Sequence, residues 1–204
     1  MDTDNIFSST YTTRTKKNPF KGMKGIRRFD TPLSNTELYT ELDNRFTPTT
    51  IREFATQDTY SSPYEYKIGD NITLFIYDRS KPQKRYIEKI KFRVDTLRHR
   101  EWDGEMEIHI YPSDFKKLFP EEMGTTLDVE NINSGLTTTY ANSGLQKIVI
   151  YRNEEMMKVL VHELLHAYGY GDHDYENINY NKMLDVPPTY NLLLNEAFIE
   201  FNAI

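Results

Sequence analysis

The chain contains 204 residues, has a formal net charge of −6 and lacks cysteine. This length is sufficient for one domain with a substantial hydrophobic core, and the lack of cysteine excludes a disulfide framework and cysteine-ligated zinc. Residues 1–10 lack the basic segment and apolar run of a signal peptide, and no apolar stretch approaches the roughly 18 residues of a membrane-spanning helix. These features predict a protein that neither enters the secretory pathway nor spans a membrane.

Charge is distributed unevenly along the chain. Residues 1–28 contain seven basic and two acidic residues, a balance of +5, so the remainder carries −11. The acidic remainder argues against nucleic acid as the main partner. Residues 1–33 are polar and without hydrophobic period, which predicts an extended or disordered basic arm before a folded domain at 34–204. Such an arm is most often a solvated tail, although its charge would also let it lie on the acidic domain and regulate access to a site there.

Hydrophobic spacing predicts the first elements of the domain in chain order. A short helix is expected over 36–46, where leucine and phenylalanine recur at helical spacing. Residues 72–77 are rich in β-branched and aromatic side chains and predict a strand. A longer helix is expected over 84–100, in which isoleucine, valine and leucine recur every three or four residues.

Three more strands are predicted in the middle of the chain. Met106, Ile108 and Ile110 alternate with a glutamate, a histidine and a tyrosine. This two-residue period is typical of a strand. Residues 134–140 and 146–151 are two further strand candidates, joined by a turn that contains asparagine and glycine. The central part of the domain is therefore expected to be a β-sheet with at least one helix packed against it.

A metal-binding pattern follows these strands. His162 and His166 frame the sequence His-Glu-x-x-His, and positions i and i+4 of a helix lie on one face, so both imidazoles can bind one metal ion. Glu163 is placed to accept a proton from a water on that metal. Residues 152–169 predict one helix, with Asn153 as its N-cap. The helix is apolar on nearly every side and hence expected to be buried, where histidine and glutamate need polar partners. Core histidines bonded to carbonyl groups are the alternative.

A final helix, predicted over 189–203 after two prolines, offers a third metal ligand. Glu196 and Glu200 share one face of this otherwise apolar helix. We expect Glu196 to be the ligand and Glu200 to hydrogen-bond the free ring nitrogen of a histidine ligand. Three protein ligands leave the fourth position of zinc for water, as catalytic zinc sites require. A solvent-facing acidic stripe is the alternative interpretation.

The order of helix, strands, His-Glu-x-x-His helix and glutamate helix resembles the catalytic core of the zincins. The segment Asn195-Glu196-x-x-x-Glu200 resembles the third-ligand motif of their gluzincin branch, which usually has aspartate where this chain has Glu200. The resemblance covers roughly residues 70–204. It implies an α+β fold with a small mixed β-sheet, a backing helix, the active-site helix and a C-terminal glutamate helix. It also implies a minimal gluzincin-like metallopeptidase that uses Zn²⁺ and cleaves a peptide or protein substrate.

A narrower resemblance is carried by the stretches IVIYRNEEMMKVLVHELLHAYGY and NEAFIEFNA. They resemble metallopeptidases encoded by large nucleocytoplasmic DNA viruses, which implies a location in the cytoplasm or the virion. A viral setting also suggests an alternative function, namely a catalytically inactive zincin-fold protein that serves as a structural or binding component of a larger assembly. The intact Glu163 argues for the peptidase, and the sequence does not indicate an oligomeric state.

A rival third ligand comes from the pattern of the metzincins. The spacing from His166 through Gly169 to Asp172 resembles that pattern, with Asp172 in place of the usual last histidine and Met183 in the place of a Met-turn. Simple helix termination at Gly169 is the alternative. The oxyanion-stabilising residue is left open among the tyrosines and the histidine between residues 168 and 190. A peptide substrate is expected to add as a strand at a sheet edge near 133–139.

Overall fold

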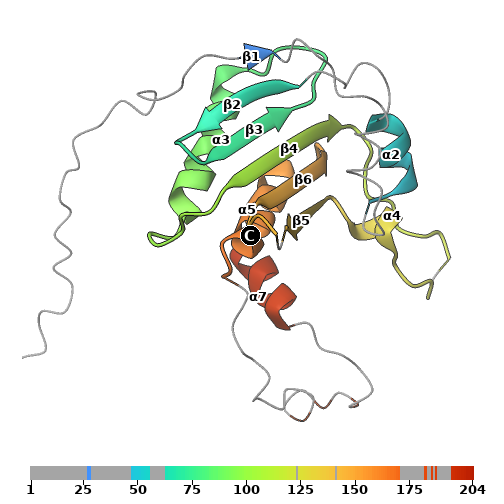
Figure 1. Cartoon of the computed structure of the whole chain (residues 1–204). Helices are drawn as coiled ribbons and strands as arrows, with labels where there is room; N and C mark the ends of the chain where they lie inside the picture. Colours follow the sequence, from blue (N-terminus) through green and yellow to red (C-terminus); the bar gives the residue numbers. More distant parts are fainter. Residues whose placement is uncertain are drawn as a thin grey trace, which may run out of the picture.

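A mixed β-sheet forms the centre of the protein (Figure 1). The computed structural model describes residues 27–28, 47–55, 63–122, 124–140, 142–170, 182, 185, 187 and 194–204. The strand order is β1-β2-β3-β4-β6-β5. The strands are β1 (Arg27–Arg28), β2 (Tyr64–Ile68), β3 (Ile72–Ile76), β4 (Met106–Ser113), β5 (Gly135–Thr139) and β6 (Gln146–Arg152). Strands β3, β4 and β6 are mutually parallel, whereas β5 runs antiparallel to β6 at one end of the strand order.

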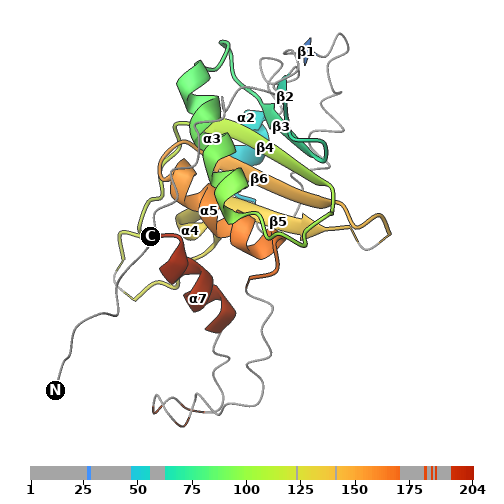
Figure 2. The ribbon, with the colours of Figure 1, turned by 90° about the vertical axis from the view of Figure 1, so that its left-hand side faces the viewer.

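Helices cover the two faces of the sheet unequally. The helices are α2 (Thr49–Ala55), α3 (Lys84–Leu97), α4 (Val129–Ile132), α5 (Met156–Ala167) and α7 (Leu194–Asn202). Figure 2 shows α3 and α5 next to each other on one side of the sheet, with α7 beyond α5. The described part of the chain is therefore an α+β structure in which α5 lies between the sheet and α7.

The alternation of side chains along the strands separates two hydrophobic clusters. On the face covered by α3 and α5, aliphatic strand residues such as Leu74 and Ile108 pack against Ile90 of α3 and Leu160 of α5, and all four are fully buried. Burial of each such side chain contributes about 1.5–3 kcal/mol. On the opposite face, Val149 and the fully buried Tyr77, Tyr111 and Tyr151 pack with Ile51 of α2. The aliphatic cluster fixes α5 against the sheet.

The ends of α3 and α5 are joined by aromatic contacts. Trp102 meets the ring of Tyr168 edge-on, with a centroid distance of 5.2 Å, and Arg98 lies 5.3 Å from the Trp102 ring. The hydroxyl of Tyr168 donates to the carbonyl of Val94 at 3.3 Å. These contacts hold the C-terminal end of α5 against α3.

The predicted strands at 72–77, 106–110, 134–140 and 146–151 are confirmed, as is the helix at 84–100, which ends at Leu97. Strand β2 and helices α2 and α4 were not predicted. Helix α4 has only four residues, so it carries no helical period; its signal is the capping box formed by Asp128 and Asn131. Helix α7 ends at Asn202, close to the predicted end of the last helix.

The predicted start of the active-site helix is wrong. Residues through Arg152 belong to β6, and the Asn153 backbone N–H continues the sheet by donating to the carbonyl of Ser113 at 2.8 Å. Asn153 is therefore not the N-cap; Glu155 is, with a left-handed backbone (φ 56°) and no capping side chain. The prediction that this helix is buried on nearly every side is also wrong, because one of its faces is partly exposed and carries Lys158 and both histidines of the motif.

Several sequence predictions lie outside the described residues. They are the helix at 36–46, the first residues of the helix predicted over 189–203, and the arm at 1–33. Strand β1, which pairs with β2, is the part of the arm that the structure describes. Among the described residues, no helix combines the length and hydrophobicity that crossing a bilayer requires.

Candidate metal centre

Helix α5 directs both histidines of the motif away from the sheet. Leu160 and Leu164 face the aliphatic cluster, and the 3.6-residue period of the helix then places His162 and His166 on the opposite side. Helix α7 packs there against α5, and Ile199 of α7 and Ala203, which directly follows the helix, are buried. The packing of α7 thus turns its acidic face toward the two imidazoles.

Three potential ligand atoms converge between α5 and α7. The Nε2 atom of His162 lies 3.2 Å from Nε2 of His166, and Oε2 of Glu196 lies 3.6 Å from the first nitrogen and 3.3 Å from the second. Two ligand atoms bonded to one zinc ion at tetrahedral angles lie about 3.3–3.4 Å apart. All three observed distances are close to this value, and two imidazoles with one carboxylate form a donor set that zinc accepts.

The immediate partners of the histidines also fit a metal site better than a pair of structural core histidines. Within the described residues, the partners of His162 and His166 are each other and the carboxylates of Glu196 and Glu200, with no backbone carbonyl among them. Three electron-rich atoms at this spacing require a bound cation or a shared hydrogen between them. The geometry therefore accommodates one metal ion without rearrangement of the three side chains.

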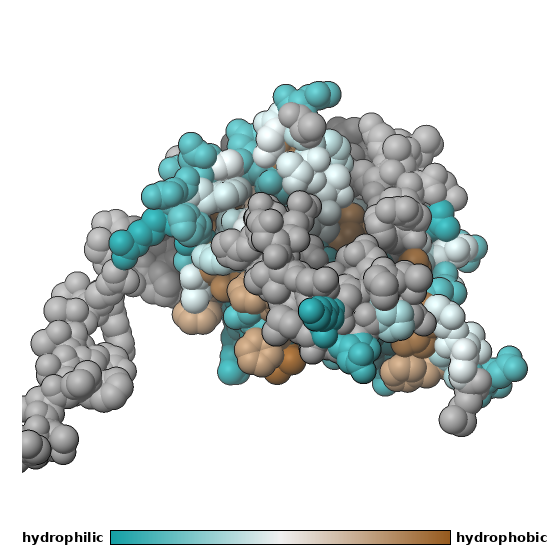
Figure 3. Space-filling model, turned by 90° about the horizontal axis from the view of Figure 1, so that it is seen from below, coloured by the Kyte–Doolittle hydropathy of each residue, from teal (hydrophilic) through white to brown (hydrophobic). Residues whose placement is uncertain are grey.

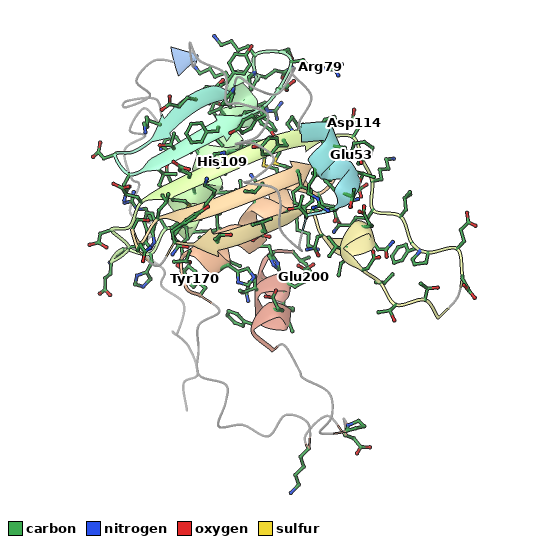
Figure 4. The ribbon with its side chains drawn as sticks, turned by 45° about the vertical axis from the view of Figure 1, so that its right-hand side comes forward. Glu53, Arg79, His109, Asp114, Tyr170 and Glu200 are labelled. Carbon is green, nitrogen blue, oxygen red and sulfur yellow. The ribbon has the colours of Figure 1, made fainter. Side chains whose placement is uncertain are left out.

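Glu200 contacts the imidazole of His162 through Nδ1, the ring nitrogen that is not part of the three-atom cluster. Its Oε2 lies 3.1 Å from Nδ1 of His162, and its other oxygen forms an ion pair with Lys158. Figure 4 shows Glu200 on α7, on the side that faces α5. The hydrogen bond from Lys158 lowers the pKa of Glu200 below its ordinary value, so Glu200 is ionised at neutral pH and accepts the Nδ1 hydrogen. The Nε2 lone pair of His162 then faces the three-atom cluster.

The protonation state of His162 suits a ligand. Burial, followed by the neighbouring His166, lowers the pKa of His162 below its ordinary value. The imidazole is therefore neutral at neutral pH, as metal coordination requires. Lys158 was not predicted as part of the site, although its position four residues before His162 places it on the same helix face.

Glu163 lies apart from the ligand atoms, in the contact between α5 and β5. Its side chain is buried, and its Oε2 accepts a hydrogen bond of 2.7 Å from the hydroxyl of Thr137. Burial raises the pKa of Glu163 to about 7, against the opposing effect of the Thr137 hydrogen bond. A carboxyl group with this pKa can both take up and release a proton near neutral pH.

The remaining site predictions are only partly covered by the structure. Asp172 and Met183 lie outside the described residues, so the rival ligand stays a prediction. Gly169 has a left-handed backbone (φ 73°) and terminates α5. The hydroxyls of Tyr168 and Tyr170 bind carbonyls of α3, and Tyr170 donates to Leu97 at 3.0 Å. Both hydroxyls are therefore engaged with backbone carbonyls of α3, and the oxyanion-stabilising residue stays a prediction.

A second polar cluster, on the opposite face of the sheet, was not predicted. His109 of β4 is buried, with Nε2 3.1 Å from Glu107 and Nδ1 2.9 Å from the Tyr77 hydroxyl. Its ring stacks on Phe75 at 4.7 Å, and Figure 4 shows it on the sheet, far from Glu200. Because an ionised carboxylate only accepts, the partners assign the Nε2 hydrogen to His109 and make Tyr77 the donor to Nδ1. Its burial indicates a structural network.

Hydrophobic side chains remain exposed on α7 and in the segment that follows β4. Helix α7 buries Ile199 but leaves Phe198 and Phe201 exposed, and Phe119 is exposed in the segment that follows β4. Seen from below, the surface shows hydrophobic side chains in separate groups among hydrophilic ones (Figure 3). The described residues of α7 thus combine one buried isoleucine with two exposed phenylalanines.

Comparison of the chain with protein families, with curated proteins and with solved structures gives no match. The sequence motif and the geometry of the site are therefore the observations from which a function is inferred.

Proposed function

We propose that this protein is a zinc-dependent metallopeptidase with a zincin-like core of the gluzincin type. The observation that carries the proposal is the spacing of 3.2–3.6 Å among the ligand atoms of His162, His166 and Glu196. The packing of the motif helix between a mixed sheet and a glutamate-bearing helix supports the zincin-like assignment. The three side chains would hold Zn²⁺, while Glu200 would keep the ring of His162 in the ligating orientation.

The protein's own residues divide the chemistry between them. Zinc, when bound, supplies Lewis acidity and lowers the pKa of a water in its open coordination position. Glu163 would accept the proton of the attacking water and pass it to the leaving amine. Its Oε2 already accepts the Thr137 hydroxyl, so Oε1 would be the oxygen that takes up the proton.

The edge of the sheet suggests how a peptide substrate would bind. Strand β5 is hydrogen-bonded to β6 on one side and ends the strand order on the other, and it packs against α5. An extended peptide that paired with the edge of β5 opposite β6 would run alongside the helix that carries Glu163. Main-chain pairing of this kind suits peptides of many sequences, so the proposal names peptides in general as the substrate class.

The test combines metal analysis with hydrolysis. Purified wild-type protein should contain one zinc per chain, and Glu196→Ala should lose it. Glu163→Gln should keep the zinc and lower the rate of peptide-library hydrolysis by at least about 10²-fold, the usual contribution of a general base. Zinc and iron are both counted, because two histidines and one carboxylate also bind iron.

Three outcomes would contradict the proposal. Loss of zinc from Asp172→Ala but not from Glu196→Ala would assign the third ligand to Asp172. Iron in place of zinc would indicate a different reaction class. A zinc-loaded wild-type protein that cleaves no peptide in the library would favour a non-catalytic, zinc-binding role.

A further inference from the structure

The carboxylate of Glu163 lies against strand β5. Thr137 of β5 places its hydroxyl oxygen 2.7 Å from Oε2 of Glu163 and 3.1 Å from the Glu163 carbonyl oxygen. The two residues are 26 positions apart in the sequence, so this contact depends on the packing of α5 against the edge strand. Because Glu163 is almost fully buried, its orientation is set by these neighbours and not by solvent.

Gly135 is the second residue of β5 that lies close to the Glu163 carboxylate. A Cβ atom at this position would lie 2.9 Å from both the Val149 carbonyl oxygen and the Val159 side chain, and 3.2 Å from Oε1 of Glu163. Glycine in a strand often marks a place where another group approaches closely, and here a helix and a carboxylate do so. The absence of a side chain at position 135 thus allows β5 to approach α5 closely enough for Thr137 to reach Glu163.

We propose that Thr137 is a positioning residue for Glu163 and that Gly135 provides the space in which this positioning occurs. The inference rests on the proposed role of Glu163 as general base. The side chain of Thr137 acts through Glu163: its hydroxyl holds Oε2, and Oε1 would then be left for the water. The edge strand would therefore both bind the substrate and orient the base, which couples the two functions in one element.

The chemistry of threonine suits this role. A hydroxyl has one hydrogen to donate and lone pairs with which to accept, and two oxygens of Glu163 lie within its reach. It can donate to the carboxylate when Glu163 is ionised. Valine has the same shape without the hydroxyl, and serine keeps the hydroxyl without the methyl group, so the two variants separate hydrogen bonding from packing.

The kinetic test compares Thr137→Val, Thr137→Ser and the matched control Thr73→Val. Thr73 lies on β3 and its hydroxyl binds Lys67 instead of Glu163. We expect Thr137→Val to keep its zinc, to lower kcat about 10- to 100-fold as expected for a misplaced catalytic group, and to change KM little. Thr137→Ser should recover most of the rate, and Thr73→Val should match the wild type. Equal kcat for Thr137→Val and the wild type would overturn the inference.

A second measurement, the melting temperature, does not depend on enzymatic activity. The loss of a hydrogen bond to a charged group should lower the melting temperature of Thr137→Val by about 3–12 °C in the wild-type background. In a Glu163→Leu background the carboxylate partner is gone, so Thr137→Val should lower the melting temperature clearly less. Equal shifts in both backgrounds would overturn the inference even if the wild type is an active peptidase. If Thr137→Val fails to fold, Thr137→Ala replaces it in both measurements.

The two readouts also separate this inference from the proposed function. A zinc-loaded wild type without peptidase activity would overturn the proposed function, and the melting temperatures would then decide whether Thr137 orients Glu163. Gly135→Ala gives a further check, because its Cβ should displace β5 or the carboxylate. A crystal structure of Gly135→Ala that retains the wild-type distance between Thr137 and Glu163 would contradict the role given to Gly135.

Discussion

Zinc should stabilise this protein by joining helices α5 and α7. Ile199 of α7 and the adjoining Ala203 are buried, whereas Phe198 and Phe201 stay exposed. Full burial of an isoleucine contributes about 1.5–3 kcal/mol, so the apolar burial seen for the described side chains of α7 is modest. A ligand present at 100 times its dissociation constant stabilises the folded state by about 2.7 kcal/mol. Metal binding and apolar packing should therefore contribute comparably to the docking of α7.

The corresponding change in melting temperature can be measured directly. For a chain of this size, 1 kcal/mol corresponds to about 2–4 °C, so zinc at 100 times its dissociation constant should raise the melting temperature by about 5–11 °C over the chelator-treated protein. Calorimetry of the wild type with zinc and with chelator gives this value. His166→Ala and Glu196→Ala should lose the rise because each removes one of the three ligand atoms.

The control is Glu163→Gln, which leaves the three ligand atoms in place and should keep the full rise. Hydrogen exchange locates the effect, since the amides of α7 should exchange faster without zinc while those of the central sheet change little. A full zinc-dependent rise in Glu196→Ala would refute the reasoning, because the metal would then be held without α7.

Two further predictions concern the fold. Leu160→Ala removes a fully buried side chain from the contact between α5 and the sheet and should lower the free energy of unfolding by about 2–5 kcal/mol; a loss below about 1 kcal/mol in chemical denaturation would contradict this packing. The hydrogen bond from His109 and the charge of Lys147 lower the pKa of Glu107. Glu107 therefore stabilises the folded state above the ordinary glutamate pKa, and this contribution disappears as the pH falls through the lowered value. Glu107→Gln should thus lower the melting temperature more at pH 7 than near pH 3, and an equal loss at both would refute it.

The fold was predictable from sequence where local pattern and burial agree. Strands β3 and β4 have a regular hydrophobic pattern because one face of each packs on helices, and α3 shows the helical period for the same reason. The start of α5 was mispredicted because good helix-terminus residues follow Arg152, yet the backbone of Asn153 is still hydrogen-bonded to β4. The position of a strand end is decided by its partner strand, which the local sequence does not contain.

The candidate site, like the fold, was predictable from sequence only in part. The helical spacing of His162 and His166 is a local property, so their convergence could be predicted from five residues. The contacts of Glu163 with Thr137 and of Glu200 with Lys158 span 26 and 42 residues respectively. Each depends on how two distant elements pack, and neither pair has a distinguishing local pattern. The sequence therefore indicates the ligands better than the residues that orient them.

The contact of Trp102 with Tyr168 gives the protein a built-in optical probe. The chain has a single tryptophan, and its ring rests against Tyr168, two residues after the second histidine of the motif. Intrinsic fluorescence excited at the tryptophan band consequently reports on one defined location, the junction between the end of α5 and α3. Movements of α5 that accompany metal uptake would alter this emission, whereas changes confined to the distant face of the sheet would leave it constant, so the two can be followed separately in solution without a label.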